Sequence, residues 1–140
     1  MMELRAYYFG NFYLSSIQQG IQALHVTTEM YNKYQGYNTP ARDMLEDWAD
    51  KYKTVVLLNG GDQATLFETL GDLEPHFKTL GLPYAFFREE ESALNCSLTS
   101  FGVVLPEAVY DFKFNWQTLD EKVMAAMAIS QVLQNFRLAN

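Results

Sequence analysis

The sequence predicts an α/β domain in which helices pack on a small mixed sheet of about four strands. Short β-prone segments alternate with longer segments whose apolar residues recur every three or four positions. Their order, β-α-α-β-α-β-β, is that of a sheet with helices on its faces. With 140 residues, of which 49% are hydrophobic, the chain suits a single core.

Residues 4–13 are aromatic and β-prone and predict the first strand, and Ser15 and Ser16 offer a cap for the helix that follows. One face of this helix is apolar and is expected to pack on the core; its residues are Ile17, Ile21, Leu24, Thr28 and Tyr31. A polar ridge runs beside that face; its residues are Gln18, Gln22, His25, Glu29 and Asn32.

A second short helix is expected to begin at Thr39-Pro40, because Pro is favoured at the first helical position. Its apolar side consists of Met44, Leu45, Trp48 and Tyr52. The nearly unbroken apolar run at residues 53–59 then predicts a central strand covered on both faces.

A third helix is expected to start after Asp62, with Pro75 kinking or splitting it near Leu73. Two strands follow, at residues 82–88 and 97–106, separated by a polar, acidic loop. The last helix is expected at residues 118–138, where Thr118 and Glu121 stand in a capping-box relation. Residues 1–110 would thus form the α/β domain, and residues 111–140 an aromatic linker with an additional C-terminal helix.

The composition limits the function classes. The net charge of −7 and the scattered Lys and Arg residues disfavour general nucleic-acid binding, which needs a basic face. We find no membrane segment, and a single cysteine fits a reducing compartment, so a soluble cytoplasmic protein is expected. No motif requires a cofactor, and the two histidines have no partner at metal-ligand spacing, so no metal site is expected.

Gln22 and His25 lie one turn apart on the polar ridge, and their role stays open from spacing alone. They can bind or orient a polar substrate, since His donates, accepts or transfers a proton near neutral pH. The simpler interpretation is a solvated His25 paired with Glu29 one turn along, and the spacing alone favours it.

Laid end to end, these segments resemble the type 2 peptidyl-tRNA hydrolase family. Residues 20–26, GIQALHV, match the end of the family's helix pattern A-A-Q-x-x-H-A through Gln22 and His25. The segments KTVVLLN, DQATLFETL, KTLGLPYAFF and FGVVLPE match the family's central strand, next helix, following strand and last strand. The resemblance covers residues 4–107 and implies the fold of that family.

The departures from the family's pattern are specific. The resemblance places Gln18 where the family has a lysine thought to act in catalysis, and Glu89 or Glu90 where it has an active-site aspartate. The family's Asp-x-Gly-x-Thr context is absent, and the chain is acidic where the family has a basic RNA-facing surface.

Three functions therefore stay open. The first is a catalytically degenerate hydrolase-like protein that binds a protein or a small ligand, which would suit a viral or mobile-element accessory factor. Its binding residues would be Gln18, Gln22, His25, Arg88, Glu89, Glu90 and Glu91. The second is an active hydrolase that cleaves the peptide–tRNA ester with His25 and Glu89 or Glu90 in acid–base roles, the only function that makes tRNA a partner. The third is a structural oligomeric subunit.

The C-terminal helix predicts a homo-oligomer of two or more copies, because its apolar residues lie on two sides. The interface residues expected from this pattern are Val123, Met127, Ile129, Val132, Leu133 and Phe136. The aromatic segment at residues 110–116 would add anchors.

Overall fold

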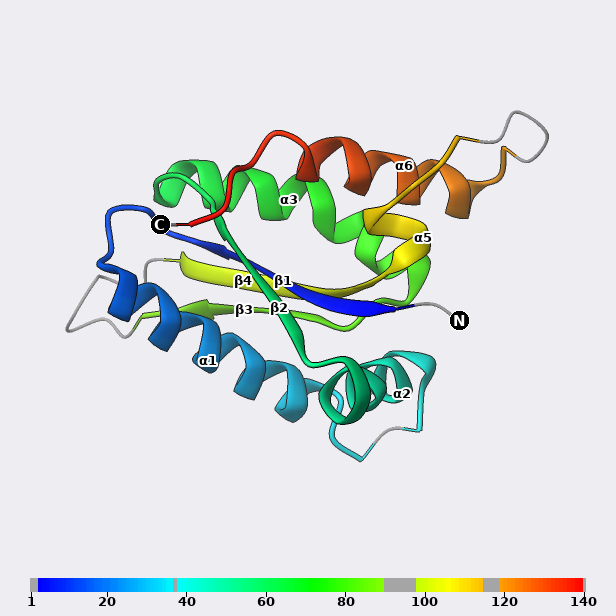
Figure 1. Cartoon of the computed structure of the whole chain (residues 1–140), viewed down its shortest axis with the longest axis horizontal. Coiled ribbons are helices and arrows are strands. Elements are labelled where there is room, and N and C mark those ends of the chain that lie inside the picture. Colours follow the sequence, from blue (N-terminus) through cyan, green and yellow to red (C-terminus); the bar gives the residue numbers. More distant parts are fainter. Residues whose placement is uncertain (1–2, 37, 90–97, 115–118, 140) are drawn as a thin grey trace.

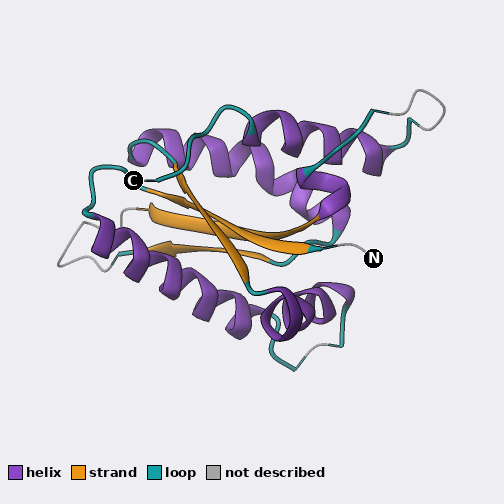
Figure 2. Cartoon of the chain, in the orientation of Figure 1, coloured by secondary structure: helices purple, strands orange, loops and turns teal. Residues whose placement is uncertain are grey.

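The computed structural model describes residues 3–36, 38–89, 98–114 and 119–139. These form a four-stranded mixed sheet in the order β2-β1-β4-β3, with helices on both faces (Figures 1 and 2). The strands are β1 (Leu4–Gly10), β2 (Thr54–Asn59), β3 (Tyr84–Arg88) and β4 (Leu98–Pro106). The helices are α1 (Ser16–Lys33), α2 (Pro40–Asp47), α3 (Gln63–Leu80), α5 (Glu107–Tyr110) and α6 (Glu121–Leu133), with a π-helical turn η1 (Trp48–Tyr52) after α2. The mixed α/β class and the element order are confirmed.

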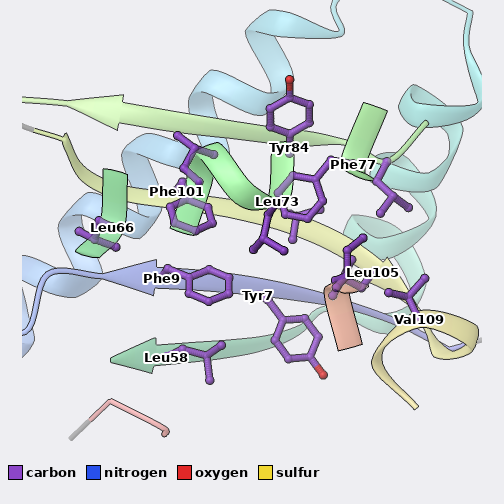
Figure 3. Packing of buried hydrophobic residues seen from close by; sticks show 14 of the residues in the cluster. Tyr7, Phe9, Leu58, Leu66, Leu73, Phe77, Tyr84, Phe101, Leu105 and Val109 are labelled. Atoms are coloured by element: carbon purple, nitrogen blue, oxygen red, sulfur yellow. The ribbon is translucent and has the colours of Figure 1, made fainter. Parts of the chain in front are cut away.

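The sheet separates two apolar clusters. Helices α1 and α2 lie on one face, and α3, α5 and α6 lie on the other (Figure 1). The cluster under α3 and α6 is the larger; within it Phe9 and Phe101 stack at 4.4 Å between ring centroids (Figure 3). The cluster under α1 and α2 is built around Tyr8, Val26 and Leu45. Within the described ranges, no helix has the length and apolarity needed to cross a membrane.

Side-chain caps start the helices where the sequence predicts them in three cases. The side chains of Ser15, Thr39 and Asp62 accept the backbone N–H groups of Gln18, Arg42 and Thr65. The fourth case differs: Asp120, not Thr118, caps α6 by accepting the Val123 N–H at 2.8 Å, and Thr118 lies outside the described residues. Helix α6 also ends at Leu133, not at residue 138.

The expectation for β2 is wrong, and of the kink or split expected at Pro75 in α3 the split does not occur. Strand β2 is an edge strand rather than a central one, because β1 pairs with it in parallel on one side only and Val55 is exposed. Helix α3 continues through Pro75 without splitting. A proline inside a helix removes one backbone hydrogen bond, and its ring crowds the carbonyl four residues earlier. Beyond Pro75, the fully buried Phe77 packs against Tyr84 and holds the next turn in place.

The C-terminal segment is part of the same packing unit. Helix α6 packs on α3 and α5, and Phe136 meets Phe9 edge to face at 5.2 Å. Beyond α6, the Asn59 N–H bonds the Arg137 carbonyl and the Ala139 N–H bonds the Leu57 carbonyl, which places residues 137–139 along the outer edge of β2. The predicted parts 1–110 and 111–140 therefore share one core.

Candidate functional site

Helix α1 packs on the sheet with a face that differs both from the predicted apolar face and from most of the polar ridge, of which only Gln22 is buried. Gln19, Gln22, Val26 and Met30 are its buried residues. The predicted core face is turned to solvent: the side chain of Ile17 is 77% exposed and that of Leu24 is 67% exposed. The predicted orientation of α1 is therefore wrong, and the face that packs on the core carries two glutamines.

Gln22 is buried because both ends of its amide find a partner. Its Nε2 donates to Glu89 Oε2 at 3.0 Å, and its Oε1 accepts from Thr99 Oγ1 at 3.1 Å. A carboxylate accepts hydrogen bonds and cannot donate them, which fixes the orientation of the amide. Only 3% of Gln22 is exposed, and the network joins α1, the end of β3 and the start of β4.

An irregularity between β3 and β4 brings Thr99 into this network. Phe87 pairs with Ser100 but Arg88 pairs with Leu98, so Thr99 is an extra residue, as in a β-bulge. Ser100 is fully buried, and its Oγ has no hydrogen-bond partner among the described residues. The sequence analysis missed both residues. The signal was the polar pair Thr99-Ser100 at the start of an otherwise apolar strand.

His25 lies beside the network without joining it through a hydrogen bond that the structure shows. Its imidazole stacks on the Phe87 ring at 4.3 Å between centroids and 8° between planes. Stacking uses the face of the ring and leaves the edge, which carries both nitrogens, available. Neither open interpretation of His25 predicts this contact, and no ion pair of the described chain joins it to Glu29.

The other predicted binding residues are spread around this centre. Gln18 is exposed, and its backbone N–H bonds the Ser15 side chain. The Arg88 guanidinium lies 5.9 Å from the centroid of the Phe67 ring, which places it toward α3 and away from Gln22. Glu90 and Glu91 lie outside the described residues. The structure thus brings Gln22, His25 and Glu89 together.

The predicted interface residues on α6 and just after it have different environments. Ile129 is fully buried inside its own chain. Val132, Leu133 and Phe136 are half-buried and pack against the same apolar cluster. Val123 and Met127 are half-buried, whereas the neighbouring Met124 is exposed. This placement leaves Met124 as the most accessible apolar side chain of the helix itself.

The donor set favours hydrogen bonding over metal chemistry. No group of three or more His, Cys, Asp or Glu side chains in the described residues could hold a metal ion. The charged group bonded to Gln22 is a carboxylate, and the remaining partner is a hydroxyl. Such a set can accept and donate hydrogen bonds and, through Glu89 or His25, can transfer a proton.

Comparison with models of known protein families found no match. Comparison with curated protein sequences also found no match.

Proposed function

We propose that this chain is a peptidyl-tRNA hydrolase-like protein that no longer hydrolyses peptidyl-tRNA and that binds a protein partner in the cytoplasm. The observation that carries the proposal is the outer face of α1, where Ile17, Ile21 and Leu24 are exposed one turn apart. Exposed apolar residues in one stripe are typical of a protein interaction surface. The grouping of Gln22 and His25, both on α1, with Glu89 at the end of β3 supports the likeness to the family.

The proposed loss of hydrolysis rests on the residue at position 18 and on the hydrogen bonds of Gln22. Gln18 stands at the position that the resemblance gives to a lysine, so it brings no positive charge to a developing oxyanion. The Gln22 amide is engaged at both ends, by Glu89 and by Thr99. One N–H and one oxygen lone pair of this amide stay unused by these two bonds, but only 3% of Gln22 is exposed, so a substrate has little access to them.

The binding proposal is tested with the double substitution Ile17→Gln and Leu24→Gln in the full chain. Capture from the lysate of the host cell should recover a protein with the parent chain and lose it with the double variant. The variant Met124→Gln, which changes an exposed apolar residue on α6, is the matched control and should keep the capture. Equal recovery by the parent and the double variant would remove α1 from the binding surface.

An active hydrolase is the second candidate, favoured by the position of Glu89 against Gln22 with His25 beside it. Release of N-acetyl-amino acid from N-acetyl-aminoacyl-tRNA measures it directly. We expect negligible turnover from the parent chain and partial recovery in Gln18→Lys, because the lysine restores a positive charge. Efficient turnover of the parent, abolished by His25→Ala, would replace the first candidate by the second.

A structural oligomer is the third candidate. Met124 and Leu119 are exposed near the start of α6, and a second copy could cover them. Light scattering at micromolar concentration tests it, with Met124→Gln as the variant that should dissociate the assembly. A monomer at that concentration would exclude this function.

A further inference from the structure

The two edges of the sheet differ in how the chain covers them. At the β2 edge, residues 137–139 supply backbone hydrogen bonds to Leu57 and Asn59. At the β3 edge, side chains bond the outward backbone groups of Tyr84: its N–H donates to the Tyr34 hydroxyl at 3.1 Å, and Lys33 Nζ donates to its carbonyl at 3.1 Å. An uncovered edge strand is a template for pairing with another strand.

The pairing of β3 with β4 shows which backbone groups face outward. The Val104 N–H donates to the Pro83 carbonyl, so this opposed pair is hydrogen-bonded. In an antiparallel ladder such pairs alternate, so Ala85 and Phe87 also bond β4, while Tyr84 and Phe86 direct their N–H and C=O groups away from it. The Tyr84 groups are occupied as described. No hydrogen bond in the described structure occupies the Phe86 groups.

Side chains frame the outward groups of Phe86 on both faces of the sheet. On the α1 side a surface pocket of about 400 Å³ is lined by Glu29, Asn32, Lys33, Ala85 and Phe86. Glu29 belongs to no ion pair of the described residues, whereas Lys33 is held over the Tyr84 ring at 3.4 Å. On the α3 side the aromatic rings are accessible, with Phe67 60% and Phe86 40% exposed.

We propose that the β3 edge binds an extended peptide segment of a partner protein as a fifth strand. The peptide residue opposite Phe86 would exchange two backbone hydrogen bonds with it and place an apolar side chain by Phe67 and Phe86. Its two neighbours would point to the α1 side, where basic side chains complement Glu29 and the acidic chain. The inference goes beyond the proposed function, because it uses the backbone of β3 and not the stripe on α1.

A second copy of this chain fits the edge less well. Two antiparallel β3 strands centred on Phe86 would place Arg88 opposite Tyr84, whose outward N–H and C=O are already bonded by Tyr34 and Lys33. The same symmetry would bring the two Glu29 carboxylates toward each other across the junction, and like charges there are unfavourable. A short foreign segment avoids both conflicts.

The test uses the tripeptide acetyl-Lys-Val-Lys, labelled with a fluorophore through a flexible C-terminal linker, and the full chain, with anisotropy as the readout. With the valine opposite Phe86, the three residues face only Ala85, Phe86 and Phe87, so the bonded groups of Tyr84 are not in their way. Methylating the amide nitrogen of the central valine removes one of the two ladder bonds at the same charge. It should weaken binding about tenfold, the value of one well-placed hydrogen bond. Replacing both lysines by glutamates should weaken it further, and Glu29→Gln should weaken binding of the lysine peptide and reduce its salt dependence.

Variants of Phe86 test the chain's own backbone. Phe86→Pro removes the outward N–H, and proline is tolerated on an edge strand where that group faces solvent. We expect about tenfold weaker binding for Phe86→Pro than for Phe86→Val, which keeps the N–H and loses the ring equally. Circular dichroism identifies any variant that has not folded, and the N-methyl peptide tests the same bond in the unmodified chain.

Amide exchange in the unmodified chain completes the experiment. The Phe86 N–H should exchange rapidly without peptide and slowly with it, whereas the Ala85 and Phe87 N–H groups should be protected in both states. Equal affinity of the methylated and unmethylated peptides, a Phe86 N–H protected without peptide, or no saturable binding would each overturn the proposal. The double substitution Ile17→Gln and Leu24→Gln removes the exposed apolar surface of α1 and should leave peptide binding unchanged. Failure of the α1 binding surface and failure of the β3 edge site can therefore be told apart.

Discussion

Gln22 and Glu89, 67 residues apart in the chain, are joined by a hydrogen bond of 3.0 Å from the amide Nε2 to the carboxylate Oε2. The bond connects the packed face of α1 to the end of β3. Because the other end of the amide accepts from Thr99, one side chain holds three elements in register. Gln22 is therefore a structural residue, whatever binding or chemistry occurs near it.

Replacing Gln22 by methionine should destabilise the fold. Methionine keeps the volume but leaves the Glu89 carboxylate and the Thr99 hydroxyl without this partner, which costs about 1–3 kcal/mol of unfolding free energy. Urea denaturation followed by circular dichroism measures the loss. Gln18→Met, on the exposed side of the same helix, should change stability by less than about 0.5 kcal/mol. Equal values for the two variants would contradict the network.

Ser100→Ala should leave the unfolding free energy unchanged or raise it. The Ser100 hydroxyl is fully buried, and its Oγ has no partner within the described residues, so its removal relieves a desolvation cost of about 1–3 kcal/mol. Thr99→Val, the neighbouring substitution, should lower it because it removes the bond to Gln22. The same urea titration compares both. A clear loss of stability in Ser100→Ala would show that the hydroxyl has a partner in solution.

Two substitutions in α1 test which face of the helix is buried. Met30→Ala should cost about 2–5 kcal/mol, as is usual for a fully buried methionine. Leu24→Ala should change the unfolding free energy by less than about 0.5 kcal/mol, because the side chain is largely in water. Thermal or urea unfolding separates the two variants. If the face predicted from the sequence were the buried one, Leu24→Ala would cost more unfolding free energy than Met30→Ala.

The orientation of α1 shows where sequence reasoning fails. Hydrophobic spacing located the helix and its cap, because local hydrogen bonds and a 3.6-residue period set both. The same spacing predicted the wrong buried face of α1, because a glutamine can be buried wherever distant residues form hydrogen bonds with its amide. Glu89 and Thr99 supply those partners, and no local pattern announces them. The error is thus one of tertiary hydrogen bonding.

The remaining errors share the same cause. The apolar run of β2 indicated burial on both faces, but strand order depends on contacts with β1 and residues 137–139 that lie far away in sequence. The bulge at Thr99 depends on the pairing of β3 with β4. For the candidate site, the resemblance named Gln22, His25 and Glu89 or Glu90; the structure shows a hydrogen bond between Gln22 and Glu89, while Thr99 and Ser100 needed the structure.

Stability should fall in alkali partly because of Tyr84. Burial, and then the hydrogen bond to the Glu74 carboxylate at 2.7 Å, raise the pKa of Tyr84 well above its usual value of 10. A raised folded pKa gives a contribution that is complete below pH 10 and is lost as the pH rises through the folded value. Burial lowers the pKa of Lys33 below its usual 10.5. The unfolded chain therefore binds the Lys33 proton more tightly, so this residue makes the unfolding free energy rise with pH below about 10.5, the opposite of the Tyr84 effect.

Tyr84→Phe isolates this contribution. Between about pH 10.5 and 12 the unfolding free energy of the variant should decline less steeply than that of the parent, by at most about 1.4 kcal/mol per pH unit. Urea titrations at several pH values measure both slopes. Titratable groups that are present in both chains contribute to both slopes, so their contributions cancel in the difference. Equal slopes would show that the Tyr84 hydroxyl ionises in the folded chain as it does when unfolded.

Ile129→Ala distinguishes a packing role of α6 from an interface role. The Ile129 side chain is fully buried within one chain, so its truncation should cost about 2–5 kcal/mol at any protein concentration. An interface residue would instead lose stability in a way that depends on concentration, because association stabilises by mass action. Urea titrations at two protein concentrations twentyfold apart make the comparison, with the exposed Met124→Ala as the control.

Since α6 covers α3 and α5 and leads into the segment paired with β2, truncation after Trp116 should unfold the chain and not merely dissociate it. A folded truncated chain would contradict the shared core and return α6 to a purely intermolecular role.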